Sequence, residues 1–211
     1  MAGADRLGYV RAMAVEGRAA GVVLAAASTN ERSSDAASRA ALVALLQLAF
    51  SGELAAAHAY RGHARSVADA EERRRIEEIE REEWHHRELV GRMLAELGAG
   101  PSRARERRAA VIGRVLGALC HVSGYLVPMY GAGRLESRNV REYEHAAELA
   151  RAAGREEWLD CLLTMAEVEW EHERYFRERV RTRALGRRLT LWPAPPPKAS
   201  IRARFGTVGA R

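Results

Sequence analysis

The sequence predicts an all-α protein whose core is a bundle of four long helices. Ala, Leu, Arg and Glu, which are good helix formers, dominate the 211 residues. Runs rich in Val, Ile, Thr and Tyr, which would indicate strands, are absent. The motif Glu-Trp-x-His occurs twice, at Glu83–His86 and at Glu169–His172, in long charged segments that are largely free of Gly and Pro. Such segments are typical of helices.

The first half of the chain predicts an N-terminal extension and one helical hairpin. Residues 1–36 form the extension, in which an Ala-rich helix is followed by the polar linker Ser28–Asp35. The first core helix is expected from about Ala37 to Val67, and the second from about Asp69 to Leu97. Gly98-Ala99-Gly100-Pro101 then ends the second helix, because neither Gly nor Pro favours a helix interior.

The second half predicts a crossover helix, a second hairpin and a tail. The crossover helix covers residues 103–122, with an apolar stripe and several arginines elsewhere on its surface. The third core helix runs from about Val127 to Ala153, and the fourth from about Arg155 to Leu185. The bundle therefore spans residues 37–186, and residues 187–211 form a basic, Pro-rich and irregular tail, since the prolines after Trp192 exclude a helix there.

The second helix offers two overlapping Glu-x-x-His pairs, and helical periodicity decides between them. Glu83 and His86 share a helix face with apolar residues, whereas Glu82 and His85 share one with charged residues. The apolar residues are Ile76, Ile79, Val90 and Met93; the charged ones are Arg75, Glu78 and Arg92. Burying the charged face would cost several kcal/mol per unpaired ion. We therefore predict that Glu83 and His86 face the core, and the same argument applies to Glu169 and His172.

Each half also supplies one carboxylate from its first helix. Glu53 is the only acid in the first core helix, and it lies on an apolar face, where a carboxylate is costly unless it binds a cation. Glu136 lies in similar surroundings in the third helix, with Glu142 and Glu144 as alternatives. A tyrosine follows each of these glutamates by seven residues: Tyr60 follows Glu53, and Tyr143 follows Glu136. We expect both tyrosines to orient ligands or to gate access.

Together these residues predict a site for two metal ions. The predicted ligands are Glu53, Glu83, His86, Glu136, Glu169 and His172. Four carboxylates nearly balance the charge of two divalent ions, and oxygen donors with imidazole favour Fe or Mn, while the lack of thiolates argues against structural Zn. In ferritin-like bundles, two glutamates and two Glu-x-x-His pairs on four helices hold such a pair of ions. We expect two Fe ions, with Mn or mixed Fe/Mn as the alternative, and the four glutamates are also the catalytic candidates.

A local stretch resembles one family within the ferritin-like di-iron carboxylate superfamily. Residues 52–63 resemble the Gly-Glu-…-Tyr-x-Gly-Gln signature of the demethoxyubiquinone hydroxylases. The resemblance implies that Glu53 is the first ligand and that the two Glu-x-x-His pairs and Glu136 are the others. The chain departs from the signature in two places, since His63 replaces the final Gln and Ala59 replaces a branched aliphatic residue.

The leading functional prediction is a di-iron carboxylate oxidoreductase that activates O2. The resemblance implies a monooxygenase of ubiquinone biosynthesis that hydroxylates a quinone-like ring, or another small apolar substrate. One alternative is iron oxidation or storage, or rubrerythrin-like peroxide scavenging, although the chain has no four-cysteine rubredoxin site. A tRNA-modifying hydroxylase is a further alternative that depends on charge alone. A helical interaction protein with a degenerate site is disfavoured, because all six ligand positions are filled.

Composition sets the expected location and partners. The net charge of +6 comes almost wholly from arginine, which is weak support for nucleic acid, so none is expected as a partner. Cys120 and Cys161 have no CxxC neighbour, which favours reduced thiols in a cytoplasmic protein. No uninterrupted apolar run reaches the roughly 18–20 residues of a spanning helix. The crossover helix is either an interfacial membrane helix or a core-facing helix with a solvated Arg face. A second copy of the chain, in a homodimer, is a further candidate partner.

Overall fold

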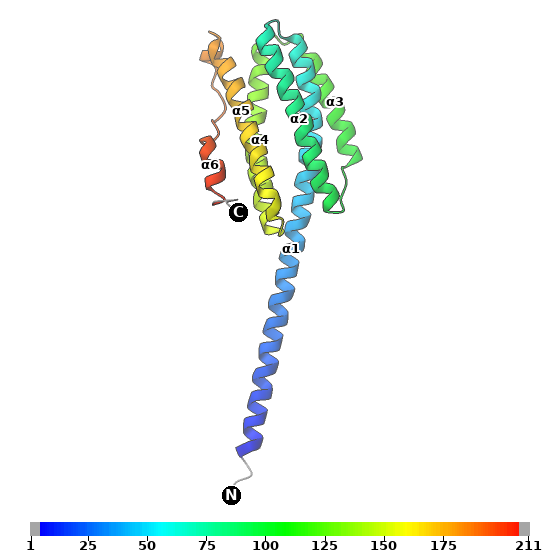
Figure 1. The fold of residues 1–211 in the computed structure, drawn as a ribbon, viewed down its shortest axis with the longest axis vertical. Coiled ribbons are helices and arrows are strands. Elements are labelled where there is room, and N and C mark those ends of the chain that lie inside the picture. Colours follow the sequence, from blue (N-terminus) through cyan, green and yellow to red (C-terminus); the bar gives the residue numbers. More distant parts are fainter. Residues whose placement is uncertain (1–4, 207–211) are drawn as a thin grey trace.

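The computed structural model describes the backbone of residues 5–206 and the side chains of residues 35–206 (Figure 1). Over this range the chain is all-α, as predicted, without a strand. The helices are α1 (Asp5–Ser66), α2 (Ala70–Glu96), α3 (Arg103–Leu119), α4 (Leu126–Ala152), α5 (Leu159–Thr182) and α6 (Lys198–Ala203). Two short 3-10 turns, η1 (Glu156–Trp158) and η2 (Gly186–Arg188), flank α5. Each predicted core helix is therefore present.

Two helical hairpins form the bundle. Helix α1 packs against α2, and α4 packs against α5, while α1 also contacts α4 and so joins the two hairpins. Helix α3 is the predicted crossover and lies against α1 on the outside of the bundle (Figure 1). This connection lets α2 and α4 belong to different hairpins while all four long helices surround one core.

Local sequence signals set the ends of the core helices. Asp69 caps α2, since its carboxylate accepts hydrogen bonds from the backbone N–H groups of Glu71 and Glu72 at 2.9 and 2.8 Å. Gly98 (φ +64°) follows the end of α2, and Gly154 (φ +68°) follows the end of α4; both adopt the left-handed conformation that glycine tolerates best. The stop signal predicted at Gly98 is confirmed.

The predicted break between extension and bundle is absent. Ser28–Asp35 is helical, and α1 runs unbroken from Asp5 to Ser66, so the linker prediction is wrong. The segment contains neither Gly nor Pro, and its polar residues each cost at most about 0.7 kcal/mol in a helix. Extending an existing helix across it needs no new nucleation. The N-terminal half of α1 consequently extends beyond the bundle (Figure 1).

Helices α1 and α3 cross with their backbones in contact. A Cβ atom on Gly62 of α1 would collide with the backbone of Gly117, and one on Gly113 of α3 would collide with the carbonyl of Ala55. Only glycine permits this approach. The glycines of α3 occupy the contact with α1, so the large apolar residues of α3 lie outside that contact. Among them, Leu116 and Leu119 are about half exposed.

The irregular tail predicted after the bundle is packed onto it. We call residues 189–205 the C-terminal strap; it contains an extended segment and α6. Trp192, Ile201 and Phe205 of the strap are all buried, with 7%, 0% and 8% exposure. The indole of Trp192 occupies the space above Gly133 of α4, where a Cβ atom would collide with it. The strap is thus an ordered part of the fold, although Pro-rich composition alone favours disorder.

One helical stretch among the described residues, Asp35–Ser66, is long and apolar enough to cross a membrane by length and composition alone. It is also the first core helix of the bundle, where Leu42 and Leu46 are fully buried. The core helix of a soluble protein passes the same test, so this finding is weak evidence for a membrane span.

Candidate metal centre

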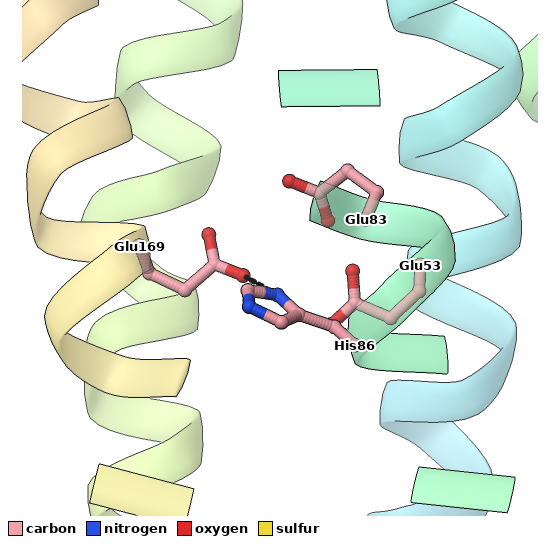
Figure 2. A group of neighbouring side chains, drawn as sticks. All are labelled: Glu53, Glu83, His86 and Glu169. Atoms are coloured by element: carbon pink, nitrogen blue, oxygen red, sulfur yellow. Dashed lines mark hydrogen bonds and ion pairs between the residues drawn. The ribbon is translucent and has the colours of Figure 1, made fainter. Parts of the chain in front are cut away.

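The six predicted ligands meet in the middle of the bundle. Each of the four long helices contributes: α1 carries Glu53, α4 carries Glu136, and α2 and α5 carry one Glu-x-x-His pair each. None of the six side chains is more than 4% exposed. Figure 2 shows Glu53, Glu83, His86 and Glu169 pointing toward one another from three helices. The burial that periodicity predicted for Glu83 and His86 is present.

The cluster divides into two overlapping groups of potential ligands. Glu53, Glu83, His86 and Glu169 place one ligand atom each within 4.8 Å of one another, and so do Glu83, Glu136, Glu169 and His172. Glu83 and Glu169 belong to both groups. The arrangement therefore has the form of two adjacent sites that share two carboxylates, with one further Glu and one His on each side.

Several polar atoms in the cluster lack a hydrogen-bond partner. These atoms are both carboxylate oxygens of Glu83, Oε2 of Glu169 and Nδ1 of His172, judged over the residues whose side chains the structure describes. An unpaired buried carboxylate oxygen is costly because it has lost its hydration without compensation. All four atoms can donate electron pairs to a cation. The residues present thus fit a pair of divalent ions by donor type, burial and unsatisfied valence.

Burial and neighbouring groups shift the pKa of three carboxylates in the cluster, Glu53, Glu136 and Glu169. Burial, and then the charge of Glu83, raises the pKa of Glu53; burial, and then the charge of Glu169, raises the pKa of Glu136. Burial acts to raise the pKa of Glu169 too, but the adjacent imidazoles of His172 and His86 overcome it and lower that pKa. Without a cation, the cluster retains protons that metal binding would displace.

Each tyrosine contacts the glutamate of the opposite hairpin. The hydroxyl of Tyr60 on α1 donates to Oε1 of Glu136 on α4, and the hydroxyl of Tyr143 on α4 donates to Oε1 of Glu53 on α1. Asn139 also donates to Oε2 of Glu136, at 2.8 Å. These hydrogen bonds are of the kind expected for tyrosines that orient ligands. Each joins a tyrosine of one hairpin to a glutamate of the other, which the seven-residue spacing within each helix does not indicate.

Glu142 and Glu144, the two alternatives to Glu136, have surroundings that differ from those of Glu136. Glu144 is buried but forms an ion pair with Arg204 of the strap at 3.3 Å. Glu142 lines a hollow together with Glu53 and Tyr143, and burial raises its pKa. Neither belongs to a group of potential metal ligands among the described side chains. The structure therefore brings Glu136 rather than Glu142 or Glu144 to the centre.

Sequence reasoning missed the role of Glu82. Its carboxylate accepts a hydrogen bond from Nε2 of His172 at 2.7 Å, across the interface between α2 and α5. A proton on Nε2 leaves the lone pair of Nδ1 facing Glu83 and Glu169, at 3.3 and 3.5 Å. Glu82 thus holds the imidazole in the tautomer that binds a cation. The sequence did hold a signal for this role, namely two consecutive acids, Glu82 and Glu83. Glu83 faces the cluster, and Glu82 contacts the histidine of the cluster, His172.

We expect Glu82→Ala to lower metal affinity by roughly 10- to 100-fold, because His172 loses the partner that sets its tautomer. The measurement is a competitive titration with a chelator, followed by metal analysis. Glu78→Ala is the matched control, since Glu78 shares Arg75 as an ion-pair partner but does not contact His172. Equal affinities of the two variants would contradict the assignment.

Comparison with known proteins agrees with this geometry. The model of a family described as ubiquinone biosynthesis protein COQ7 matches residues 40–178, which is 139 of the 211 residues. The matched region contains all six predicted ligands and both tyrosines. No curated protein and no solved structure matches the chain.

Proposed function

The chain belongs to the ubiquinone biosynthesis protein COQ7 family, a family of di-iron hydroxylases with a ferritin-like fold, and from this premise we propose that it hydroxylates a quinone-like ring with O2. The observation that carries the proposal is the buried cluster of four glutamates and two histidines with unsatisfied donor atoms. A di-iron centre held there would supply the activation of O2. The protein's own residues would hold the ions, orient the substrate and exclude water.

We propose separate roles for the six ligands. Glu53 and His86 would hold one ion, Glu136 and His172 would hold the other, and Glu83 and Glu169 would be available to both. The overlap of the two groups supports this division. The hydroxyls of Tyr60 and Tyr143 fix the outer glutamates through hydrogen bonds. Rigid placement of the ligands keeps the site ready for chemistry without reorganisation.

An apolar cavity next to the cluster is the proposed substrate site. It has a volume of about 410 Å³ and lies between α1, α3 and the start of α4. Its lining includes Ala56, Tyr60, His63, Leu116, Leu119 and Val127. A cavity of this size accommodates a substituted ring, and its lining suits an apolar molecule. Because Tyr60 lines the cavity and contacts Glu136, a ring bound there lies one side chain away from the proposed ligands.

The crossover helix supports a peripheral contact with a membrane. The large apolar side chains of α3 face solvent, with Val111, Ile112 and Val115 each more than half exposed, while its glycines face α1. This arrangement disfavours the core-facing alternative and resembles an interfacial helix flanked by arginines. Leu119 belongs to both the exposed face and the cavity lining, so a lipid-soluble substrate could enter directly from the bilayer.

The test combines metal analysis with isotope labelling. Purified protein is expected to bind about two Fe per chain. With a chemical reductant, ¹⁸O2 and a short-tailed demethoxyubiquinone analogue, the product should gain one ¹⁸O atom by mass spectrometry. Iron-free protein is the control. Protein that binds iron but incorporates no label would contradict the hydroxylase proposal, and protein that holds no metal would contradict the centre itself.

A further inference from the structure

His63 is a buried histidine whose function the metal centre does not explain. Its side chain is 3% exposed, lies on α1 and lines the apolar cavity. No side chain or backbone group within the described residues forms a hydrogen bond with its imidazole nitrogens. Its ring instead packs against the ring of Phe176, with centroids 6.0 Å apart and planes 19° from parallel.

The other polar groups of the cavity are either satisfied or near its edge. The Tyr60 hydroxyl donates to Glu136, and the Cys120 thiol donates to the carbonyl of Leu116 at 3.2 Å. Ser123 is only half-buried. His63 is therefore the one deeply buried lining group among those described whose polar atoms have no protein partner. A buried group of this kind gains from a partner that a bound molecule supplies.

The imidazole is uncharged at neutral pH. Burial lowers the pKa of His63 to about 4, and no acidic side chain on the described elements pairs with it. A neutral imidazole carries one N–H donor and one acceptor nitrogen. It can donate to a carbonyl oxygen or accept from a hydroxyl, so it suits a neutral oxygen-bearing ring in either redox form. Because it is uncharged, it adds no charge–charge attraction for a carboxylate or a phosphate.

Neighbouring rings fix the position of His63 relative to the centre. Phe176 stacks on His63 and also on Tyr60, whose ring is 5.6 Å away and within 6° of parallel. Tyr60 lies one helical turn before His63 on α1, so both side chains point to the same side of the helix. The line of contacts runs from His63 through Phe176 and Tyr60 to Glu136.

We propose that His63 anchors a carbonyl or hydroxyl oxygen of the substrate ring and thereby sets which ring position faces the metal centre. The inference deepens the proposed function and rests on it. His63 is a positioning and specificity residue, and the tail of the substrate leaves past Leu119 toward the exposed face of α3. The ligand class is an apolar ring that bears a neutral oxygen.

The test compares two probes that share a tail but differ in oxygen content. Decyl-1,4-benzoquinone has ring oxygens, and decylbenzene has none. Dissociation constants are measured by equilibrium dialysis with the iron-loaded full chain. We expect His63→Leu to weaken quinone binding roughly tenfold, the effect of about one lost hydrogen bond, and to leave decylbenzene binding unchanged. His63→Gln, which restores a donor and an acceptor, should recover most of the quinone affinity.

Control variants separate this role from a structural one. His145→Leu makes the same replacement at an exposed histidine outside the cavity lining and should change neither dissociation constant. His63→Leu should retain its iron and should lose specificity in the position of ¹⁸O. If His63→Leu lost equal affinity for both probes, or lost none for either, the inference would be overturned. The proposed function would still stand in that case, provided that the native chain incorporated ¹⁸O. Failure of the native chain to bind the quinone would overturn both.

Discussion

Replacing Glu83 with Ala is expected to remove both metal ions, whereas replacing Glu53 with Ala is expected to remove one. Glu83 belongs to both groups of potential ligands, and Glu53 belongs to one. The loss of metal affinity should exceed the roughly 10- to 100-fold effect of removing a residue that only hydrogen-bonds a ligand, because here a ligand atom itself is removed. Inductively coupled plasma mass spectrometry of each purified variant gives the number of ions per chain. Hydroxylation should fall to background in both variants, because each needs the complete pair.

The overlapping Glu-x-x-His pair provides the control for this experiment. His85 is exposed and faces away from the cluster, whereas His86 is 3% exposed and lies within it. His85→Ala should retain two ions and normal turnover, while His86→Ala should lose at least one ion. Circular dichroism establishes that each variant remains folded. Full occupancy in Glu83→Ala, or a loss in His85→Ala equal to that in His86→Ala, would contradict the assigned register.

Replacing Trp192 with Ala is expected to lower the free energy of unfolding by about 3 kcal/mol. The indole fills the space over Gly133, and its Nε1 donates to Oε1 of buried Glu173 at 2.7 Å. The guanidinium of Arg177 stacks over the same ring at 4.8 Å. The substitution therefore creates a cavity and also removes a hydrogen bond from a buried carboxylate. Urea denaturation followed by circular dichroism measures the change.

Leu189 supplies the matched control in the same strap. Its side chain is 41% exposed, so Leu189→Ala should change the free energy of unfolding by no more than about 0.5 kcal/mol. Metal content of Trp192→Ala should stay at two ions per chain if the strap stabilises the bundle without forming the centre. A Trp192→Ala variant as stable as the native chain would show that the strap does not contribute to stability.

Helical periodicity was sufficient to predict that the candidate metal ligands are buried. Helix faces with apolar neighbours identified Glu83 and His86, and the isolated acid on an apolar face identified Glu53. The burial predicted for these residues is confirmed, and it is informative because a charged group on a buried face is costly and so has few explanations. The same reasoning chose Glu136 over Glu142 and Glu144, and the structure places only Glu136 in the cluster.

Features that depend on contacts between distant segments were not predictable. Glu82 was set aside because its own helix face is charged, yet its partner, His172, lies on another helix. The order of the strap depends on Gly133, whose missing side chain admits an indole from 59 residues later. Local propensity also misjudged Ser28–Asp35, where weak helix formers continue a helix that its neighbours had already established.

The crossed hydrogen bonds of Tyr60 and Tyr143 make the two hairpins mutually dependent. Each hairpin carries a glutamate and a tyrosine at the same spacing, but neither tyrosine serves its own glutamate. A hairpin on its own would keep its sequence motif and lose the hydrogen bond that orients its carboxylate. The two halves are similar in the manner of an internal duplication. Only the two hairpins together, however, carry the complete set of candidate ligands and their tyrosine partners. Both outer glutamates therefore have their tyrosine partners only when the two hairpins are packed together.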